Sequence, residues 1–205
     1  MPSERTGSIA GVVLAAGTST RMGQNKLFME LEGETLVRRA VGRAAAAGFD
    51  PLIVVVGHEA ERVQRALDGL PYRAVFNPDY ERGVNSSLRA GIRAVSESPA
   101  RAAVVMLADM PFVTSAMVET LVEKYRRGSA PLVITDYRGV NAPPMLYDRS
   151  LFEELSIPEG HGCGKQVVKP HRQEAESATW PAEALTDLDA PEDYERVKAA
   201  MEELR

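Results

Sequence analysis

The chain has 205 residues, of which 44% are hydrophobic, and this length suits one domain with a substantial buried core. Its formal net charge of −5 and the absence of a dense Lys/Arg block disfavour a protein that wraps a nucleic-acid backbone. No apolar stretch approaches ~20 residues, so the sequence predicts no membrane span. The only cysteine, Cys163, excludes an intrachain disulfide and disfavours a cysteine-based zinc site, which fits a cytoplasmic location.

Short β-branched runs alternate with longer helical stretches up to residue 128. Strands are expected over residues 9–17, 51–58, 73–77 and 101–109, and helices over 34–48, 59–69, 85–97 and 114–128. The expected N-caps are Asn85 or Ser86 for the third helix and Thr114 or Ser115 for the fourth. Gly48 is the expected C-cap of the first helix.

The pattern changes after Pro131. Strands are expected over 131–135 and 141–148, a short helix over 149–155, and a glycine-rich loop over 157–168 that runs into another helix. Residues 187–205 predict a final helix, with Pro191 at its first position and Asp189 or Ala190 as its cap.

This repetition of strand and helix predicts an α/β fold: a Rossmann-like, three-layer α/β/α arrangement around a mostly parallel sheet. In such folds the ligands lie beyond the carboxyl ends of the strands. We expect one domain over residues 1–205, with residues 1–7 flexible.

The first strand runs into "VVLAAGTSTRMGQNK", residues 12–26. This is not a Walker A loop, because five residues separate Gly17 from Gly23 and Gln24 follows, and it lacks the Gly-x-Gly-x-x-Gly of dinucleotide sites. Its backbone N–H groups, with Arg21 and Lys26, are suited to surround a polyphosphate. The alternative is a surface loop with solvated cations.

A second polar residue follows another buried strand. Asp109 ends the apolar run of "VVMLADMPFV", and a carboxylate opposite a phosphate loop can hold Mg²⁺, which prefers hard oxygen ligands. An isolated Asp of this kind usually caps a turn. The combination with the opening loop favours the metal site.

Four segments together resemble a known family. "LAAGTSTRMGQNK", "NPDYERGVNSSLRAG", "LADMPFV" and "DLDAPEDY" resemble the signature blocks of the MobA-like nucleotidyltransferases, most closely the molybdenum cofactor cytidylyltransferases. The resemblance implies the nucleotide-diphospho-sugar transferase type of fold. It also implies a nucleotide-binding part over about 8–128 and an acceptor-binding part over about 129–190.

The family resemblance implies a reaction in which the terminal phosphate of molybdopterin attacks the α-phosphate of CTP and pyrophosphate leaves. The implied nucleotide-binding residues are Leu14, Ala15, Ala16, Gly17, Arg21, Lys26, Asn77, Gly83, Ser86 and Ser87. Asp109 matches the Mg²⁺ ligand, and Asp187 and Asp189 match a late acidic pair near the metal. Arg21, Lys26 and Asp109 are the expected catalytic residues, because phosphoryl transfer needs positioning and charge neutralisation more than a protein nucleophile.

Two positions bear on the choice of base. Guanylyltransferase relatives usually resemble "LAGG", whereas this chain has "LAAG" with Ala16, and Asn77 stands where the guanine branch tends to have Asp. Both differences favour CTP.

The chain departs from the family in the expected acceptor loop. Cytidylyltransferases usually resemble "GDxGAR" where this chain has "GHGCGK". The resemblance makes the expected acceptor contacts Gly160, His161, Gly164 and Lys165. His161 stands in place of an acid and Lys165 in place of an arginine. This leaves open another phosphorylated acceptor, such as a sugar or polyol phosphate. A non-catalytic molybdenum-cofactor carrier for a molybdenum hydroxylase is the third possibility, which the presence of Lys26 and Asp109 disfavours.

Overall fold

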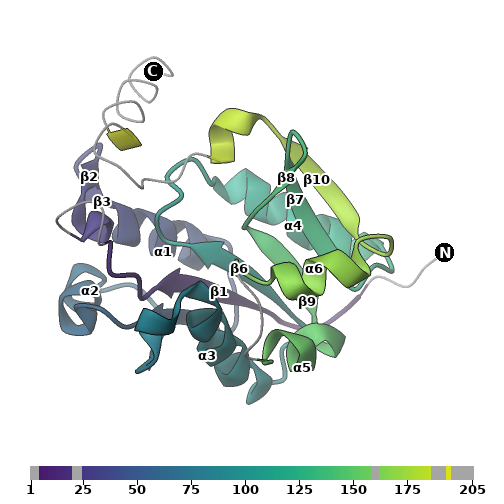
Figure 1. Ribbon diagram of the computed structural model, residues 1–205, viewed down its shortest axis with the longest axis horizontal. Helices are drawn as coiled ribbons and strands as arrows, with labels where there is room; N and C mark the ends of the chain where they lie inside the picture. The colour runs from purple at the N-terminus through teal and green to yellow at the C-terminus, as the bar shows by residue number, and fades with distance from the viewer. Residues whose placement is uncertain (1–4, 20–24, 158–161, 186–192, 195–205) are drawn as a thin grey trace.

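The computed structural model describes residues 5–19, 25–157, 162–185 and 193–194, which form three layers around a central sheet (Figure 1). The strand order is β10-β7-β9-β6-β1-β4-β5, with β8 paired to β7. Neighbours are parallel except where β8 or β9 takes part. The strands are β1 (Ile9–Ala15), β4 (Leu52–Val56), β5 (Arg73–Phe76), β6 (Ala102–Leu107), β7 (Leu132–Tyr137), β8 (Val140–Asn141), β9 (Met145–Asp148) and β10 (Glu176–Trp180). The predicted mostly parallel α/β fold is confirmed.

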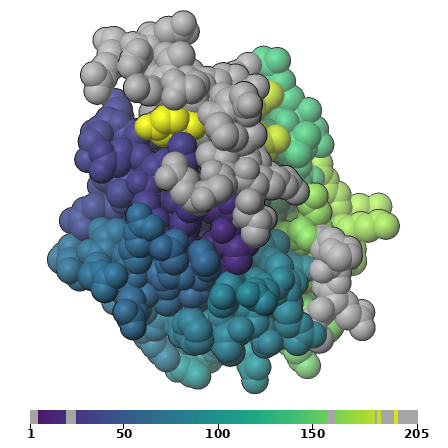
Figure 2. All heavy atoms as spheres, turned by 60° about the vertical axis from the view of Figure 1, so that its left-hand side comes forward, coloured from purple at the N-terminus to yellow at the C-terminus, as the bar shows by residue number. Residues whose placement is uncertain are grey.

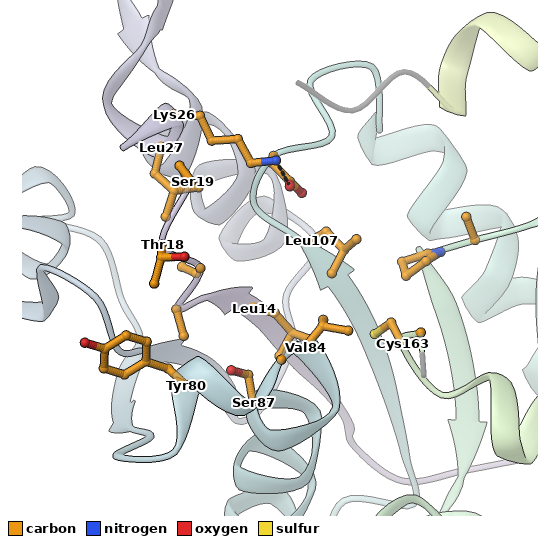
Figure 3. A pocket seen from close by; sticks show the side chains of 18 of the residues that line it. Leu14, Thr18, Ser19, Lys26, Leu27, Tyr80, Val84, Ser87, Leu107 and Cys163 are labelled. Carbon is orange, nitrogen blue, oxygen red and sulfur yellow. Dashed lines mark ion pairs between the residues drawn. The ribbon is translucent and has the colours of Figure 1, made fainter. Parts of the chain in front are cut away.

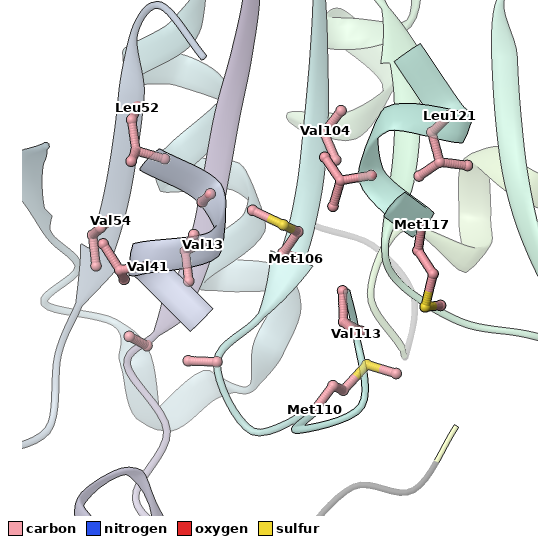
Figure 4. Close-up of a cluster of buried hydrophobic side chains, with 14 of the residues drawn as sticks. Val13, Val41, Leu52, Val54, Val104, Met106, Met110, Val113, Met117 and Leu121 are labelled. Atoms are coloured by element: carbon pink, nitrogen blue, oxygen red, sulfur yellow. The ribbon is translucent and has the colours of Figure 1, made fainter. Parts of the chain in front are cut away.

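Helices cover both faces of this sheet, and the central strands are therefore hydrophobic throughout. The helices are α1 (Leu36–Ala46), α2 (Ala60–Ala66), α3 (Val84–Ser96), α4 (Ser115–Arg127), α5 (Phe152–Leu155) and α6 (Lys165–His171). Every residue of β1 and of β4 is buried. On the face covered by α1 and α4, Val13, Val41, Met106 and Leu121 join one hydrophobic cluster (Figure 4). Each such side chain contributes about 1.5–3 kcal/mol by burial.

The other face of the sheet carries α3, α5 and α6 (Figure 1). Leu88, Ile92 and Val95 of α3 are fully buried and have the spacing of one helix face. Gly91 lies on the same face, and a Cβ atom there would lie 2.5 Å from Cγ1 of Val12. The missing side chain at residue 91 therefore lets α3 approach β1 closely.

The predicted helix ends are partly correct. The Thr114 side chain accepts a hydrogen bond from the backbone N–H of Met117, and Gly48 follows α1 with a φ of +71°. The predicted cap of α3 at Asn85 or Ser86 is wrong, because the helix begins at Val84 after Gly83, whose φ is +99°. Gly83 can adopt this positive φ because it has no side chain.

Three features were not predicted. Residues Glu30–Leu31 (β2) and Glu34–Thr35 (β3) pair in a small hairpin, so α1 begins later than expected. The predicted strand over 141–148 is two strands, β8 and β9, divided by Pro143 and Pro144. Strand β10 pairs in parallel with β7 at the sheet edge.

The end of the described chain returns to the opening segment. The Tyr194 hydroxyl donates to the carbonyl of Glu30 at 2.7 Å, and its ring packs beside Leu31 and Leu36. In the space-filling view, the yellow residues near the C-terminus lie on the dark N-terminal segment (Figure 2). The rest of the predicted C-terminal helix, with its expected caps, lies outside the described residues.

None of the described helices has the length and apolar character that a bilayer crossing requires.

Candidate active site

A pocket of about 720 Å³ opens beyond the carboxyl ends of β1 and β6 (Figure 3). One wall is the chain after β1, a second is formed by residues 80–87, and a third by residues 140–143 and 162–165. Its size falls in the range of small-molecule sites, ~300–1,000 Å³. Its position is where α/β sheets bind ligands.

An ion pair lies in this pocket. Nζ of Lys26 is 2.7 Å from Oδ2 of Asp109, and the two side chains are 12% and 21% exposed. In Figure 3 the Lys26 side chain extends to this carboxylate, and a dashed line marks the ion pair. The cation of the opening loop and the carboxylate at the end of β6 therefore occupy one site.

The fold explains why these two residues meet. Strands β1 and β6 are parallel neighbours with Leu14 opposite Leu107, and the N–H of Ala108 donates to the carbonyl of Leu14 at 3.1 Å. Lys26 begins a short 3₁₀ helix, η2 (Lys26–Phe28), whose cap Asn25 accepts a hydrogen bond from the N–H of Leu27. The two strand ends and this cap fix the directions from which the charges approach.

The end of β1 and the backbone that follows it form the adjoining wall. Leu14, Ala15, Ala16 and Gly17 all line the pocket. The methyl group of Ala16 is almost completely buried, because the residue is only 3% exposed. Arg21, the second expected cation, lies outside the described residues.

The expected nucleotide-binding residues between positions 77 and 87 divide into two groups. Gly83 and Ser87 line the pocket, whereas Asn77 and Ser86 do not appear among its lining residues. Nδ2 of Asn77 donates to the hydroxyls of Ser86 and Ser87 at 2.9 and 3.0 Å, and its Oδ1 accepts from the N–H of Asp79. Asn77 thus orients the segment that carries Ser87, with its own amide buried behind the wall.

The third wall contains part of the expected acceptor loop. Lys165, Gly162 and Cys163 line the pocket, together with residues 140–143. Gly164 lies behind them with a φ of +72°, and a Cβ atom there would lie 2.5 Å from the Tyr147 hydroxyl. Gly160 and His161 lie outside the described residues.

Cys163 belongs to this wall as an uncharged thiol. The residue is 8% exposed, and burial raises the pKa of its thiol to about 12, with a smaller contribution from the carboxylate of Asp109. A thiol in this state is a poor nucleophile at neutral pH. Cys163 therefore packs into this wall without the reactivity of a thiolate.

The described residues provide one hard-oxygen ligand beside the expected phosphate site. No group of three or more His, Cys, Asp or Glu side chains able to hold a metal occurs among them. A carboxylate such as Asp109 fits Mg²⁺, which commonly takes its remaining ligands from phosphates and water. The other expected ligands, Asp187 and Asp189, lie outside the described residues.

Tyr80 was missed as a pocket residue. It is the only aromatic side chain among the described residues that line the pocket, and it comes from the 3₁₀ helix η3 (Tyr80–Arg82). It stands within "NPDYERG", part of a segment already tied to nucleotide binding, so an aromatic residue at that place was the available signal.

Comparison with known proteins agrees with this geometry. Residues 11–176 match the model of the MobA-like NTP transferase domain. The chain is 28% identical to the purine catabolism protein PucB of Bacillus subtilis over 96% of this chain and 99% of that protein. It is 31% identical to a probable molybdenum cofactor guanylyltransferase of Opitutus terrae over 64% of this chain and 62% of that protein.

Solved structures agree as well. The homologue of Mycobacterium tuberculosis Rv0371c from Mycobacterium sp. strain JC1 superposes with a TM-score of 0.80 at 30% identity, covering 96% of this chain and 98% of that one. Rv0371c itself, in a complex with manganese, gives a TM-score of 0.74 at 28% identity, covering 94% and 99%. The chain therefore belongs to the MobA-like NTP transferase family.

Proposed function

We propose that this protein transfers CMP from CTP to the terminal phosphate of the molybdopterin form of the molybdenum cofactor and releases pyrophosphate. The observation that carries the proposal is the Lys26–Asp109 pair, at 2.7 Å, inside a pocket whose third wall is suited to an acceptor. The relatives that share the fold and this family include one named for molybdenum cofactor guanylyltransferase activity.

The proposed reaction needs no nucleophile from the protein. An acceptor phosphate oxygen attacks the α-phosphorus of CTP, and the bond from that phosphorus to the bridging oxygen of pyrophosphate breaks. Lys26, Arg21 and the backbone N–H groups after β1 neutralise and orient the triphosphate. Mg²⁺, with Asp109 as a ligand, supplies further charge neutralisation when bound.

The choice of CTP depends on two features of the chain. Ala16 replaces the glycine that the guanine branch tends to have, and Asn77 replaces its aspartate. In the structure both residues are buried, Ala16 as part of the pocket lining and Asn77 behind it. We therefore expect them to select the base through the residues that they support, Tyr80 and Ser87, instead of by direct contact.

The acceptor would bind against the third wall. Val140, Ala142, Pro143 and Cys163 give that wall an apolar character, and Lys165 adds a cation for a phosphate. A flat pterin with a terminal phosphate matches this combination. Another phosphorylated acceptor, such as a sugar or polyol phosphate, is the second candidate, because Lys165 lacks the bidentate fork of the usual arginine.

The test is to incubate the protein with Mg²⁺, molybdopterin and each nucleoside triphosphate in turn, measuring pyrophosphate release and the mass of the product. The proposal predicts a cytosine dinucleotide, formed faster from CTP than from GTP, ATP or UTP, and no pyrophosphate when the acceptor is omitted. Transfer to a sugar or polyol phosphate, with none to molybdopterin, would identify the second candidate as the acceptor. Binding of molybdopterin without transfer would favour a carrier that delivers the cofactor to a molybdenum hydroxylase.

A further inference from the structure

Tyr80 lies at the end of the pocket away from the ion pair. Figure 3 shows Lys26 near one end of the pocket, and Tyr80 and Ser87 near the other, below Thr18. A nucleoside triphosphate is elongated, so phosphates held at Lys26 leave the base at the opposite end of the nucleotide. The Tyr80 ring is the aromatic surface that the described part of the pocket offers there.

The backbone of Gly57, which has no side chain, packs against the Tyr80 side chain on the side away from the pocket. A Cβ atom on Gly57 would lie 2.6 Å from Cβ of Tyr80 and 2.9 Å from Cβ of Ala16. The missing side chain of Gly57 thus leaves room for Tyr80 and Ala16 to pack against its backbone. The ring of His58 lies 6.1 Å from that of Tyr80 and limits the ring on a further side.

We propose that the nucleobase stacks on Tyr80 and that Ala16 and Gly57 are positioning residues that set the place of this ring. This inference rests on the proposed function. Stacking suits a partly exposed phenol, because every base has a π face and this ring has Gly57 packed behind it. It also gives the largely buried methyl group of Ala16 a route to base selection through the position of the Tyr80 ring.

The inference is tested by titration calorimetry without any acceptor, using CTP and inorganic tripolyphosphate as probes in the presence of Mg²⁺. Tyr80→Ala is expected to weaken CTP binding about tenfold while leaving tripolyphosphate binding unchanged, because that probe has no base. Tyr80→Phe keeps the flat ring and is expected to bind CTP like the wild type. Tyr80→Leu keeps the bulk without the ring and is expected to behave like Tyr80→Ala.

Phe76→Ala is the matched control. Phe76 is another aromatic residue on the segment before the pocket, 58% exposed and outside the lining, so CTP affinity should not change. Wild-type CTP affinity in both Tyr80→Ala and Tyr80→Leu would overturn the stacking, and so would an equal loss of tripolyphosphate affinity. If Tyr80→Ala fails to fold, the comparison of Tyr80→Phe with Tyr80→Leu decides alone.

The positioning role has its own readout, the ratio of CTP to GTP affinity. Ala16→Gly is expected to change this ratio when Tyr80 is present and to leave it unchanged in the Tyr80→Ala background. An equal change in both backgrounds would mean that Ala16 acts independently of the ring. Because these titrations contain no acceptor, absence of transfer to molybdopterin would contradict the proposed function while leaving the stacking intact.

Discussion

Nζ of Lys26 lies 2.7 Å from Oδ2 of Asp109, so the first and third signature segments meet at one pair of charges. A metal ion that binds Asp109 must share this carboxylate with the ammonium group or displace it. A triphosphate entering the pocket offers Lys26 new oxygen partners. The ion pair therefore links the loop after β1 to any metal that accompanies the nucleotide.

Lys26→Ala should lower kcat/KM for CTP on the order of 10²-fold, because a charge that stabilises the transition state is lost. Initial rates of pyrophosphate release measure the effect. Lys124→Ala is the control, because its partner Glu176 lies 4.0 Å away on the surface formed by α4 and β10. Turnover at the wild-type rate in Lys26→Ala would remove this residue from the mechanism.

Asp109→Asn should abolish most metal-dependent activity while preserving the shape of the side chain. The amide keeps one oxygen but loses the negative charge that a divalent cation requires. Manganese binding, followed by calorimetry in the presence of CTP, should weaken about tenfold or more. Unchanged manganese affinity in this variant would place the ion elsewhere.

Asn77→Asp should destabilise the fold by about 1–3 kcal/mol, because two serine hydroxyls lose their amide donor and a buried carboxylate replaces it. Urea unfolding measures the change. Asn77→Ser, which retains a smaller donor, should cost less. The account of Asn77 as the support of Ser87 fails if Asn77→Asp is as stable as the wild type.

Stability should fall in alkaline solution. Burial raises the pKa of the Cys163 thiol from 9.0 to about 12, and burial with a hydrogen bond to Asp148 raises that of Tyr125 from 10.0 to about 12. Both groups hold their protons more tightly in the folded state than in the unfolded state. Their contribution to the free energy of unfolding is therefore complete below about pH 9 and is lost as the pH rises toward 12.

The free energy of unfolding, measured in urea between about pH 8 and pH 11, should therefore decrease steadily at the upper end. Tyr125→Phe removes one of the groups whose pKa is raised in the folded state and should flatten the decrease. A profile for the wild type that stays level across this range would contradict the burial of these groups.

The sequence allowed the α/β fold to be predicted because hydrophobic strands such as β1 and β4 stand out from amphipathic helices. β10 escaped notice because an edge strand with exposed polar residues lacks that signal. The order of strands also could not be read from the chain. Only pairing of β1 with β6 brings Lys26 to Asp109.

The sequence indicated which residue types form the candidate site but not the directions in which their side chains point. A motif match placed Asn77 among the nucleotide contacts, whereas its amide turns toward Ser86 and Ser87. Tyr80 lay in the same motif and was passed over, because exposure of a turn residue depends on what packs behind it, here Gly57. Such contacts join segments that are distant in sequence and follow only from the fold.

The central claim is that the triphosphate lies between Lys26 and a metal held by Asp109. A crystal structure with CTP and Mn²⁺, in which anomalous scattering locates the ion, tests it most directly. The account predicts the ion on the Asp109 carboxylate, with phosphate oxygens in contact with both the ion and Nζ of Lys26. A triphosphate bound away from Lys26, or an ion that does not touch Asp109, would contradict it.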